Sequence, residues 1–453
     1  MASLSETTDI ASDRLPAADH DSSAARHPSS RARLYRLLWR WHFYAGLITA
    51  PVLLVAAITG GIYVFIEELQ PVIYPELFRS TSASGSQRSL DELAAAVRRA
   101  HPDAQLNFAA EAKHPGLNAT FAVKLPAGPR TVFVDPATGD VAGSYHEPDS
   151  FFGIVLGLHR RLLLGSVGRM VVELAASWGL VLLLTGTYLW WPQRLGRPRL
   201  PTQGVWYPRV RGSWLLILRD WHGVVGFYSL GTAAFVLFTG LFFTQVFGNG
   251  YKRATNLGGE LPAAFAVSPK SEAPAGRSRV SLAAVLDAAE PHLPGYGARR
   301  VQLPSGPQDV FRVSRADGSS PTWRTTVFVD AYTARVVHTV GWDDAPPAHK
   351  MRMSAYPIHV GGIFGLPTKV AALLTCAALV LLVITGIWMW WRKRPRGTWG
   401  FPPSNAELAV PGWLIAAIYG LGILLPAVGI SLLLMMLGEA SAAWWGRRRA
   451  VNR

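Results

Sequence analysis

The apolar residues of this chain are gathered into five long runs, separated by stretches rich in charged and polar residues. A run of about 18 or more apolar residues with few charges is long enough to cross a membrane as a helix. The runs occupy residues 43–66, 170–191, 224–247, 370–391 and 413–437. The pattern predicts a helical membrane protein with five spans. The fifth span has Pro426 in its middle, so a broken or re-entrant helix is an alternative there.

Two longer polar stretches between the spans have a different pattern. Each contains an alternating segment, Thr-Val-Phe-Val-Asp at 131–135 and again at 326–330, which is typical of a β-strand that ends in a turn. Each also has a serine that precedes a short helical pattern, Ser89 in the first stretch and Ser281 in the second. We therefore expect two small α+β modules, each with one helix and a few antiparallel strands.

The spans also repeat, and four histidines lie at matched positions of the repeat. In each half, 17 residues separate the first histidine from a Thr-Gly pair, and 26 residues separate the second histidine from another Thr-Gly pair. The matched residues are His42 and His222, Thr59-Gly60 and Thr239-Gly240, His159 and His359, and Thr185-Gly186 and Thr385-Gly386. The sequence therefore predicts a four-span core made of a two-span unit that occurs twice in the same orientation, with the fifth span added at the C-terminal end.

The arginines predict how the chain is oriented. They cluster before the first span, between the second and third spans and after the fourth, and arginine-rich segments next to spans face the cytoplasm. The predicted order is a disordered cytoplasmic tail (1–33), the first span (34–66), a periplasmic module (67–150), the second span with a preceding interfacial helix (151–192), an arginine-rich cytoplasmic loop (193–220), the third span (221–247), a second periplasmic module (248–350), the fourth span with a preceding interfacial helix (351–392), a cytoplasmic loop (393–410) and the fifth span (411–445).

A parallel repeat has a pseudo-twofold axis along the membrane normal, so equivalent residues lie at equal depth and face each other if they are near the axis. His42 and His222 then pair near one membrane face, and His159 and His359 pair near the other. Two opposed imidazoles in a helix bundle are suitable axial ligands for a b-type haem, which needs no covalent attachment. We therefore expect two b haems. Zinc is the competing metal, but it usually takes three or four close ligands.

Residues near the histidines suit a haem site, although each has a simpler interpretation. Arg160 and Arg161 follow His159 and are candidates for pairing with haem propionates, while contact with lipid headgroups is the alternative. Four glycines near the histidines would permit a flat macrocycle to approach, although glycine is also common where membrane helices pack. These glycines are Gly46, Gly165, Gly226 and Gly365.

Glu173 lies inside the second span, where the repeat has Leu373 at the matched position. A carboxylate inside a membrane span is costly and is by default a functional candidate. Glu173 is therefore a candidate for contacting a polar substrate or for handling a proton. The alternative is an interfacial carboxylate satisfied by its neighbours, such as Arg169.

Composition narrows the functional classes. The formal net charge is +15, but the arginines lie beside the spans, which favours lipid contact and topology over nucleic-acid binding. Cys376 is the single cysteine, so no disulfide framework and no covalent haem-attachment motif can form. The sequence has no dinucleotide-binding, flavin, phosphate-loop or His-Glu-x-x-His signature. An oxidoreductase of this kind would take electrons from a membrane quinol or a cytoplasmic donor.

Together these motifs resemble the PepSY-associated transmembrane helix family over residues 33–395. The resemblance rests on Trp41-His42-Phe43-Tyr44-Ala45-Gly46, Thr59-Gly60-Gly61-Ile62-Tyr63, Leu158-His159-Arg160-Arg161, Thr185-Gly186-Thr187-Tyr188 and their second-half repeats. It implies PepSY-like periplasmic modules and, by similarity to bacterial inner-membrane siderophore reductases, two haems held by the four histidines. The resemblance also implies reduction of ferric-siderophore iron. One departure is Pro357, where the first half has Gly157, so the two outer histidine sites are expected to differ in geometry.

The sequence thus favours a di-haem b oxidoreductase of the bacterial inner membrane that transfers electrons across the bilayer to a ferric siderophore or another ferric chelate in the periplasm. One alternative is a component of a siderophore or metal transporter, which would need a midplane site built from broken helices. Another is a non-enzymatic, membrane-anchored PepSY protein with a binding or regulatory role. That alternative leaves the four matched histidines unexplained.

Overall fold

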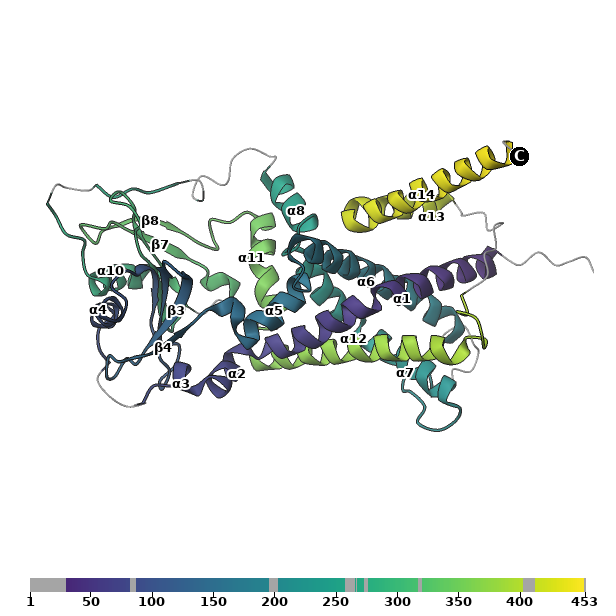
Figure 1. Ribbon diagram of the computed structural model, residues 1–453, viewed down its shortest axis with the longest axis horizontal. Helices are drawn as coiled ribbons and strands as arrows, with labels where there is room; N and C mark the ends of the chain where they lie inside the picture. Colours follow the sequence, from purple (N-terminus) through teal and green to yellow (C-terminus); the bar gives the residue numbers. More distant parts are fainter. Residues whose placement is uncertain are drawn as a thin grey trace, which may run out of the picture.

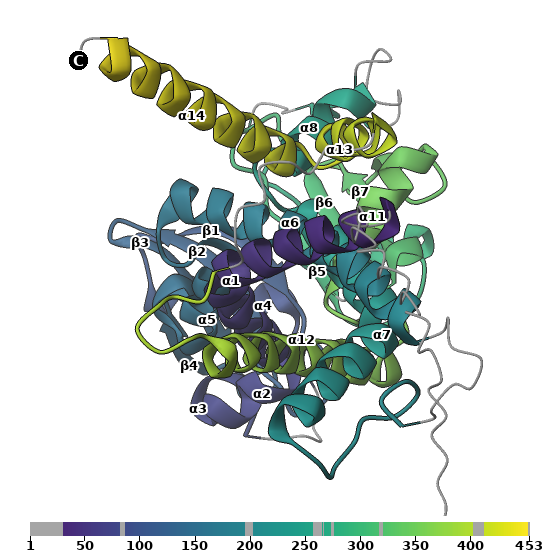
Figure 2. The same ribbon diagram turned by 90° about the vertical axis from the view of Figure 1, so that its right-hand side faces the viewer.

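Four long helices form the membrane part of the protein (Figures 1 and 2). The computed structural model describes residues 30–81, 87–194, 203–256, 265, 267–272, 276–316, 320–401 and 412–451. Within these residues, the helices long and apolar enough to cross a membrane lie in α1 (Ser30–Val64), α6 (Gly165–Arg194), α7 (Trp214–Leu241) and α12 (Leu366–Lys393). These helices confirm the prediction of a helical membrane protein. Much of the predicted N-terminal tail lies outside the described residues.

The four helices form a ring in which the two halves of the chain alternate. Helix α1 packs against α6 and α12, and α7 packs against the same two helices. Helices α1 and α7, which are equivalent in the repeat, therefore lie diagonally across the ring. The first histidine of each half is on one of these two helices, so the arrangement brings the matched residues toward a common axis.

The predicted fifth span is two helices, which confirms the broken-helix alternative at Pro426 and corrects the continuous span at 413–437. Helix α13 (Gly412–Leu424) ends just before Pro426, where α14 (Pro426–Val451) begins. Proline has no N–H to donate and clashes with the preceding turn, so the helix cannot continue through it. Gly422 and Gly429 face each other across the break, where even a Cβ on Gly422 would lie 3.1 Å from the Cα of Gly429. Helix α14 packs against α6 near this break (Figure 1), where the Trp178 indole donates a hydrogen bond to Ser431.

The stretches between the spans form one eight-stranded antiparallel sheet at one end of the bundle (Figure 1). Two separate modules were expected, but their strands share this sheet in the order β4-β3-β2-β1-β5-β6-β7-β8. The strands are β1 (Gln105–Ala110), β2 (Ala119–Leu125), β3 (Gly128–Val134), β4 (Val141–Tyr145), β5 (Arg299–Gln302), β6 (Phe311–Arg315), β7 (Thr326–Val329) and β8 (Val336–Val340). Both alternating segments predicted from the sequence lie in this sheet, in β3 and β7.

Helices α4 (Leu90–Ala100) and α10 (Leu282–Ala289) cover the face of the sheet that points away from the bundle (Figure 1). Ser89 and Ser281 cap these helices, as the sequence predicted: each side chain accepts a hydrogen bond from a backbone N–H three residues ahead. The inward side chains of both halves form one continuous apolar core with the two helices. The two modules are therefore a single folded unit.

The seam between the halves is the pairing of β1 with β5, and it lies on the pseudo-twofold axis. Ala109 pairs with Val301, and both are fully buried. These positions are 192 residues apart, the same offset that separates Ser89 from Ser281. Each residue of this central pair therefore faces its own repeat mate, as an exact twofold would require. The duplication extends through the sheet as well as the spans.

Short helices connect the sheet to the bundle. The first half uses α2 (Ile66–Ile73), α3 (Pro75–Phe78) and α5 (Phe151–Arg161), and the second half uses α8 (Phe247–Asn256) and α11 (Pro347–His359). Helices α5 and α11 each lead into a long return helix and lie between the sheet and the bundle (Figure 1). They carry the second histidine of each half.

Candidate functional site: two histidine pairs

The four predicted histidines come together as two pairs, one at each end of the helix ring. His42 on α1 lies opposite His222 on α7, with ring centroids 6.4 Å apart and an interplanar angle of 85°. His159 on α5 lies opposite His359 on α11, with ring centroids 5.9 Å apart and an angle of 50°. We refer to His42 and His222 as the sheet-distal pair and to His159 and His359 as the sheet-proximal pair.

The two pairs are separated by most of the thickness of a membrane. His159 contacts Thr59 on α1, and Thr59 lies 17 residues after His42 on the same helix. At a rise of 1.5 Å per residue, this spacing corresponds to about 25 Å along the helix. The hydrocarbon core of a bilayer is about 30 Å thick. The pairs therefore lie near opposite faces of the bilayer.

A threonine on the neighbouring helix fixes each imidazole of the sheet-distal pair. Nδ1 of His42 lies 3.0 Å from Oγ1 of Thr185, and Nδ1 of His222 lies 2.9 Å from Oγ1 of Thr385. Each threonine hydroxyl donates its own proton to a backbone carbonyl four residues earlier. The threonine oxygen must then accept from the imidazole. Both rings therefore carry their proton on Nδ1, and Nε2 keeps its lone pair.

The sheet-proximal pair has the same protonation for a different reason. Nδ1 of His159 lies 2.9 Å from the carbonyl oxygen of Ala56, and Nδ1 of His359 lies 2.9 Å from that of Val236. A carbonyl can only accept, so each Nδ1 must donate. Thr59 and Thr239 lie 3.4 Å from the same two nitrogens. The hydrogen bonds of the two sites match, but the backbone around the histidines differs, as the Pro357 departure predicted: α5 continues two residues past His159 to Arg161, whereas α11 ends at His359.

The glycine that follows each threonine packs against the same histidine ring. A Cβ would lie 3.0 Å from His159 at Gly60 and 2.9 Å from His359 at Gly240, and 3.1 Å from His42 at Gly186. Gly386 has the corresponding contact with His222 at 3.5 Å. The Thr-Gly pairs are therefore the supports of the histidines. The sequence showed their constant spacing, but the contact itself depends on which helix lies next to which.

The four glycines predicted to accommodate a macrocycle have other surroundings. Gly46 and Gly226 lie nearest to leucine side chains of the neighbouring helices α6 and α12, which is ordinary helix packing. Gly165 and Gly365 have φ of +61° and +68°, and a Cβ at either would meet open space. These two glycines make the left-handed turn that starts each return helix.

Arg160 and Arg161 end α5 directly after His159, and both are exposed. Loss of part of its hydration against the protein, and then the nearby charge of Arg169, lower the pKa of Arg160 below its ordinary value. An anion close to Arg160 would offset both effects. The second half has Val360 and Gly361 at the matched positions, so this excess positive charge lies on one side of the sheet-proximal pair.

Glu173 is fully buried and accepts three backbone hydrogen bonds. Its carboxylate receives the N–H groups of Gln245, Val246 and Phe247 at 3.0, 2.8 and 2.6 Å. These N–H groups belong to the junction of α7 and α8, where helix geometry leaves donors without partners. We therefore assign Glu173 a structural role as the cap of this junction, rather than the substrate or proton role considered from sequence.

The donor geometry fits a metal ion held between two imidazoles. Imidazole nitrogens bind metal ions such as zinc at about 2 Å, so two rings on opposite sides of one ion have centroids about 6 Å apart. Both pairs match this separation, and in both the lone pair is on Nε2. Among the described residues, no group of three or more His, Cys, Asp or Glu side chains is arranged to hold a metal ion. Each pair supplies two imidazoles, which is the number of axial ligands that a planar cofactor such as haem would need.

The fold and the two pairs define a class of membrane protein: a duplicated two-span unit that holds paired histidines at each end of its helix ring. Comparison with protein families agrees with this class. The chain belongs to the PepSY-associated TM region family, whose profile matches residues 39–393. No curated protein matches the chain.

Proposed function

We propose that this protein is a di-haem b oxidoreductase of the bacterial inner membrane that reduces ferric-siderophore or similar ferric-chelate iron on the periplasmic side. One observation carries the proposal. All four matched histidines have Nδ1 engaged as a donor and Nε2 left with a lone pair, and they form two pairs with ring centroids about 6 Å apart. Axial histidine ligands of metals usually donate their other ring N–H in this way.

In this proposal, His42 and His222 would hold one haem, and His159 and His359 would hold the other. A bound haem supplies one-electron redox chemistry through its iron. The Thr-Gly supports would hold the two rings of each pair opposite each other when the cofactor binds. Arg160 and Arg161 lie next to the sheet-proximal pair and are the candidates for neutralising the propionates.

The proposed direction of electron flow follows from the arginines. The arginine-rich segments favour a cytoplasmic location for the sheet-distal end, which leaves the sheet in the periplasm. A quinol or a cytoplasmic donor would reduce the sheet-distal pair, and the ferric chelate would be reduced at the sheet-proximal end. Reduction is useful because hard oxygen chelators hold Fe(II) more weakly than Fe(III).

An optical spectrum of the detergent-purified protein, oxidised and then reduced with dithionite, tests this proposal. We expect sharp low-spin b-type bands and about two haems per chain by pyridine haemochrome, in line with two bis-histidine sites. His222→Ala and His359→Ala should each remove about one haem, while the exposed His292→Ala should keep both. A protein that stays colourless after expression with added haem precursor would contradict the proposal and favour the transporter or anchor alternatives.

A further inference from the structure

The bundle-facing side of the second half of the sheet has a row of polar and aromatic side chains. Phe108, Gln302, Arg312 and Phe328 are direct cross-strand partners on β1, β5, β6 and β7. Arg300 and its cross-strand partner Ser314 lie in the next row on the same face. The residues between them along the strands, such as Val301 and Val313, point to the opposite face and are buried under α4 and α10.

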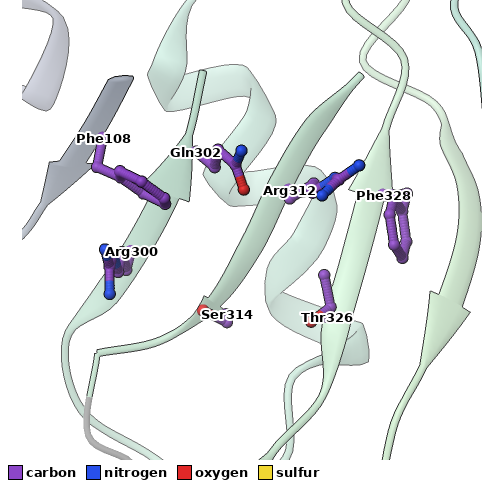
Figure 3. A pocket seen from close by; sticks show the side chains of 7 residues that line it. All are labelled: Phe108, Arg300, Gln302, Arg312, Ser314, Thr326 and Phe328. Carbon is purple, nitrogen blue, oxygen red and sulfur yellow. The ribbon is translucent and has the colours of Figure 1, made fainter. Parts of the chain in front are cut away.

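Two adjoining cavities lie over this face. The smaller has a volume of about 290 Å³. It is lined by Phe108, Arg300, Gln302, Arg312, Ser314, Thr326 and Phe328 (Figure 3). The larger, of about 530 Å³, shares Arg300, Ser314 and Thr326 with it and extends to α11. We call the two together the arginine pocket. Its volume is in the range of small-molecule sites, which are typically about 300–1,000 Å³.

Positive charge dominates the arginine pocket. Arg300, Arg312, Arg324 and Arg352 line it, as does Arg315, which is already paired with Glu290, and none of the described lining residues is acidic. The guanidinium of Arg300 lies 4.1 Å from the ring centroid of Phe108, and that of Arg312 lies 5.5 Å from the ring of Phe328. Aromatic contacts of this kind position a guanidinium without neutralising it. The charge therefore remains available to an anion.

The first half of the same sheet has different residues at the positions that match Arg300 and Arg312. By the repeat offset of 192, Arg300 corresponds to Phe108 and Arg312 corresponds to Thr120. The register agrees, because Thr120 pairs with Phe133 as Arg312 pairs with Phe328. Phe78 of α3 packs on Phe133 with ring centroids 4.6 Å apart. The arginines are therefore a feature of the second half and are not required by the fold.

Packed aromatic rings connect the arginine pocket to the sheet-proximal pair. Arg324 lines the pocket and lies 5.8 Å from the ring centroid of Tyr356 on α11. Tyr356 packs edge-on to Phe243 at 6.3 Å, and Phe243 lies 5.8 Å from His359. Helix α11 also carries His349 and Arg352 in the pocket and ends at His359. Helix α11 therefore connects the residues that line the pocket with His359 of the sheet-proximal pair.

We propose that the arginine pocket binds the substrate and that this substrate is an anionic, oxygen-rich ferric chelate of the polycarboxylate class. The guanidinium group pairs with carboxylates through two parallel hydrogen bonds, and several such groups around one cavity select a ligand with several carboxylates. The two phenylalanine rings contribute apolar contact beside the charge. The identity of the metal rests on the proposed function, whereas the selection for negative charge does not.

Calorimetric titration of the full chain in detergent with Ga(III)–citrate, which is anionic and is not reduced, tests this inference. We expect saturable binding that weakens about tenfold or more in R300Q/R312Q, because two charge-assisted contacts are lost. The matched control is R98Q/R99Q, which removes two exposed arginines of α4 on the covered side of the sheet and should bind as the wild type does. Unchanged unfolding midpoints of both variants would show that neither change disturbs the fold.

The inference would be overturned by no binding by the wild type, by equal weakening in both double variants, or by equal affinity for a neutral Ga(III) trihydroxamate. Inorganic phosphate that binds as tightly as Ga(III)–citrate would also overturn the assignment to chelates. The haem content of the same samples separates this test from that of the proposed function. A protein without haem that still binds Ga(III)–citrate would support the pocket proposal and contradict the reductase proposal. A di-haem protein that does not bind Ga(III)–citrate would support the reductase proposal and contradict the pocket proposal.

Discussion

Threonine has a specific task beside each candidate ligand, but the two pairs depend on it differently. At the sheet-distal pair Thr185 and Thr385 lie within hydrogen-bond distance of Nδ1, with the Leu382 carbonyl as a further acceptor for His222, whereas backbone carbonyls are the nearer acceptors at the sheet-proximal pair. Supporting bonds of this type typically contribute about 10–100-fold to metal affinity. The structure therefore predicts unequal sensitivity of the two sites to the same substitution.

The prediction is tested with the double variants T185V/T385V and T59V/T239V. The first should lose the sheet-distal haem and retain about one haem per chain, because valine cannot accept from Nδ1. The second should retain about two haems, because the carbonyls of Ala56 and Val236 remain. Pyridine haemochrome counts on the purified variants measure both results. Equal losses would contradict the different roles assigned to threonine.

Gly240 is a position where one methyl group should displace a ligand. A Cβ there would lie 2.9 Å from Cε1 of His359, closer than packing allows, so Gly240→Ala should shift the ring and broaden or remove the low-spin bands of one haem. Gly231→Ala is the control on the same helix, because a Cβ there meets nothing within 4 Å. The control should leave the spectrum unchanged and stabilise the helix by up to about 1 kcal/mol. Identical spectra for the two variants would refute the close contact.

Asp135 stabilises the turn after β3 in a pH-dependent way. Burial opposes its ionisation, but hydrogen bonds from Thr81, Ala137 and Ser80 outweigh burial and lower the pKa from 3.8 to about 2. A carboxyl group whose pKa is lowered by folding contributes its full stabilisation at pH values above its pKa in the unfolded chain. This contribution is lost as the pH falls through its pKa in the folded protein. Asp135→Asn should therefore cost about 2 kcal/mol at pH 7 and almost nothing near pH 2.

Unfolding of the Asp135→Asn variant and of the wild type, followed from pH 7 down to pH 2, measures this difference. The exposed Asp140, in the same turn, provides the control Asp140→Asn, which should show little change at any pH. A penalty for Asp135→Asn that stays constant down to pH 2 would mean that the carboxylate charge is not its source.

At the residue scale, the sequence was sufficient to find the histidines, because duplication places them twice at the same spacing. It was not sufficient to find what holds them, because Thr185 meets His42 only after α6 has packed beside α1. The arginine pocket was missed for a similar reason. Arg300, Arg312 and Arg324 are spread over strands and a loop, and only the register of the sheet brings them together.

Among the elements, the junction of α7 and α8 depends on a single carboxylate from α6. Glu173→Gln keeps the shape of the side chain but removes the charge that three N–H groups bind. We expect a loss of about 2–3 kcal/mol, because hydrogen bonds to charged groups are the stronger ones. Thermal unfolding in detergent and limited proteolysis at the junction measure the effect. Glu76→Gln, at an exposed position on α3, is the control and should behave like the wild type.

The fifth span shows the limit of counting apolar residues. Its length satisfied the criterion for a span, but the backbone of Pro426 divides it into α13 and α14, which turn back on each other at Gly422 and Gly429. The alternating strands and the serine caps, by contrast, depend on a few neighbouring residues. Local patterns of this kind were sufficient to predict β3, β7, α4 and α10.

The whole molecule is joined along the seam of the sheet by more than strand pairing. The Asp91 carboxylate of α4 accepts the N–H groups of Leu282 and Ala283 at the start of α10, in the other half. Glu111 forms a two-pronged ion pair with Arg299 across the β1–β5 edge. The sequence could not predict this union, because any two exposed strand edges of matching length are able to pair.

The double variant D91N/E111Q tests how far the seam holds the halves together. We expect hydrogen exchange of the backbone amides in β5 and at the start of α10 to accelerate about tenfold or more, since charged acceptors are lost on both sides of the seam. Exchange in β7, which lies away from the seam, should not change. Uniform acceleration across the whole sheet would show instead that the halves open as one unit.

The pairing of Ala109 with its own repeat mate, Val301, bears on how the protein originated. In a symmetric dimer of half-length chains, the same strand would meet itself across the axis, and each histidine pair would be one residue facing its counterpart in a second subunit. A half-length ancestor would thus have possessed both sites before gene fusion. In a fused chain the two copies need not be identical, and here one copy has arginines on its sheet where the other has Phe108 and Thr120.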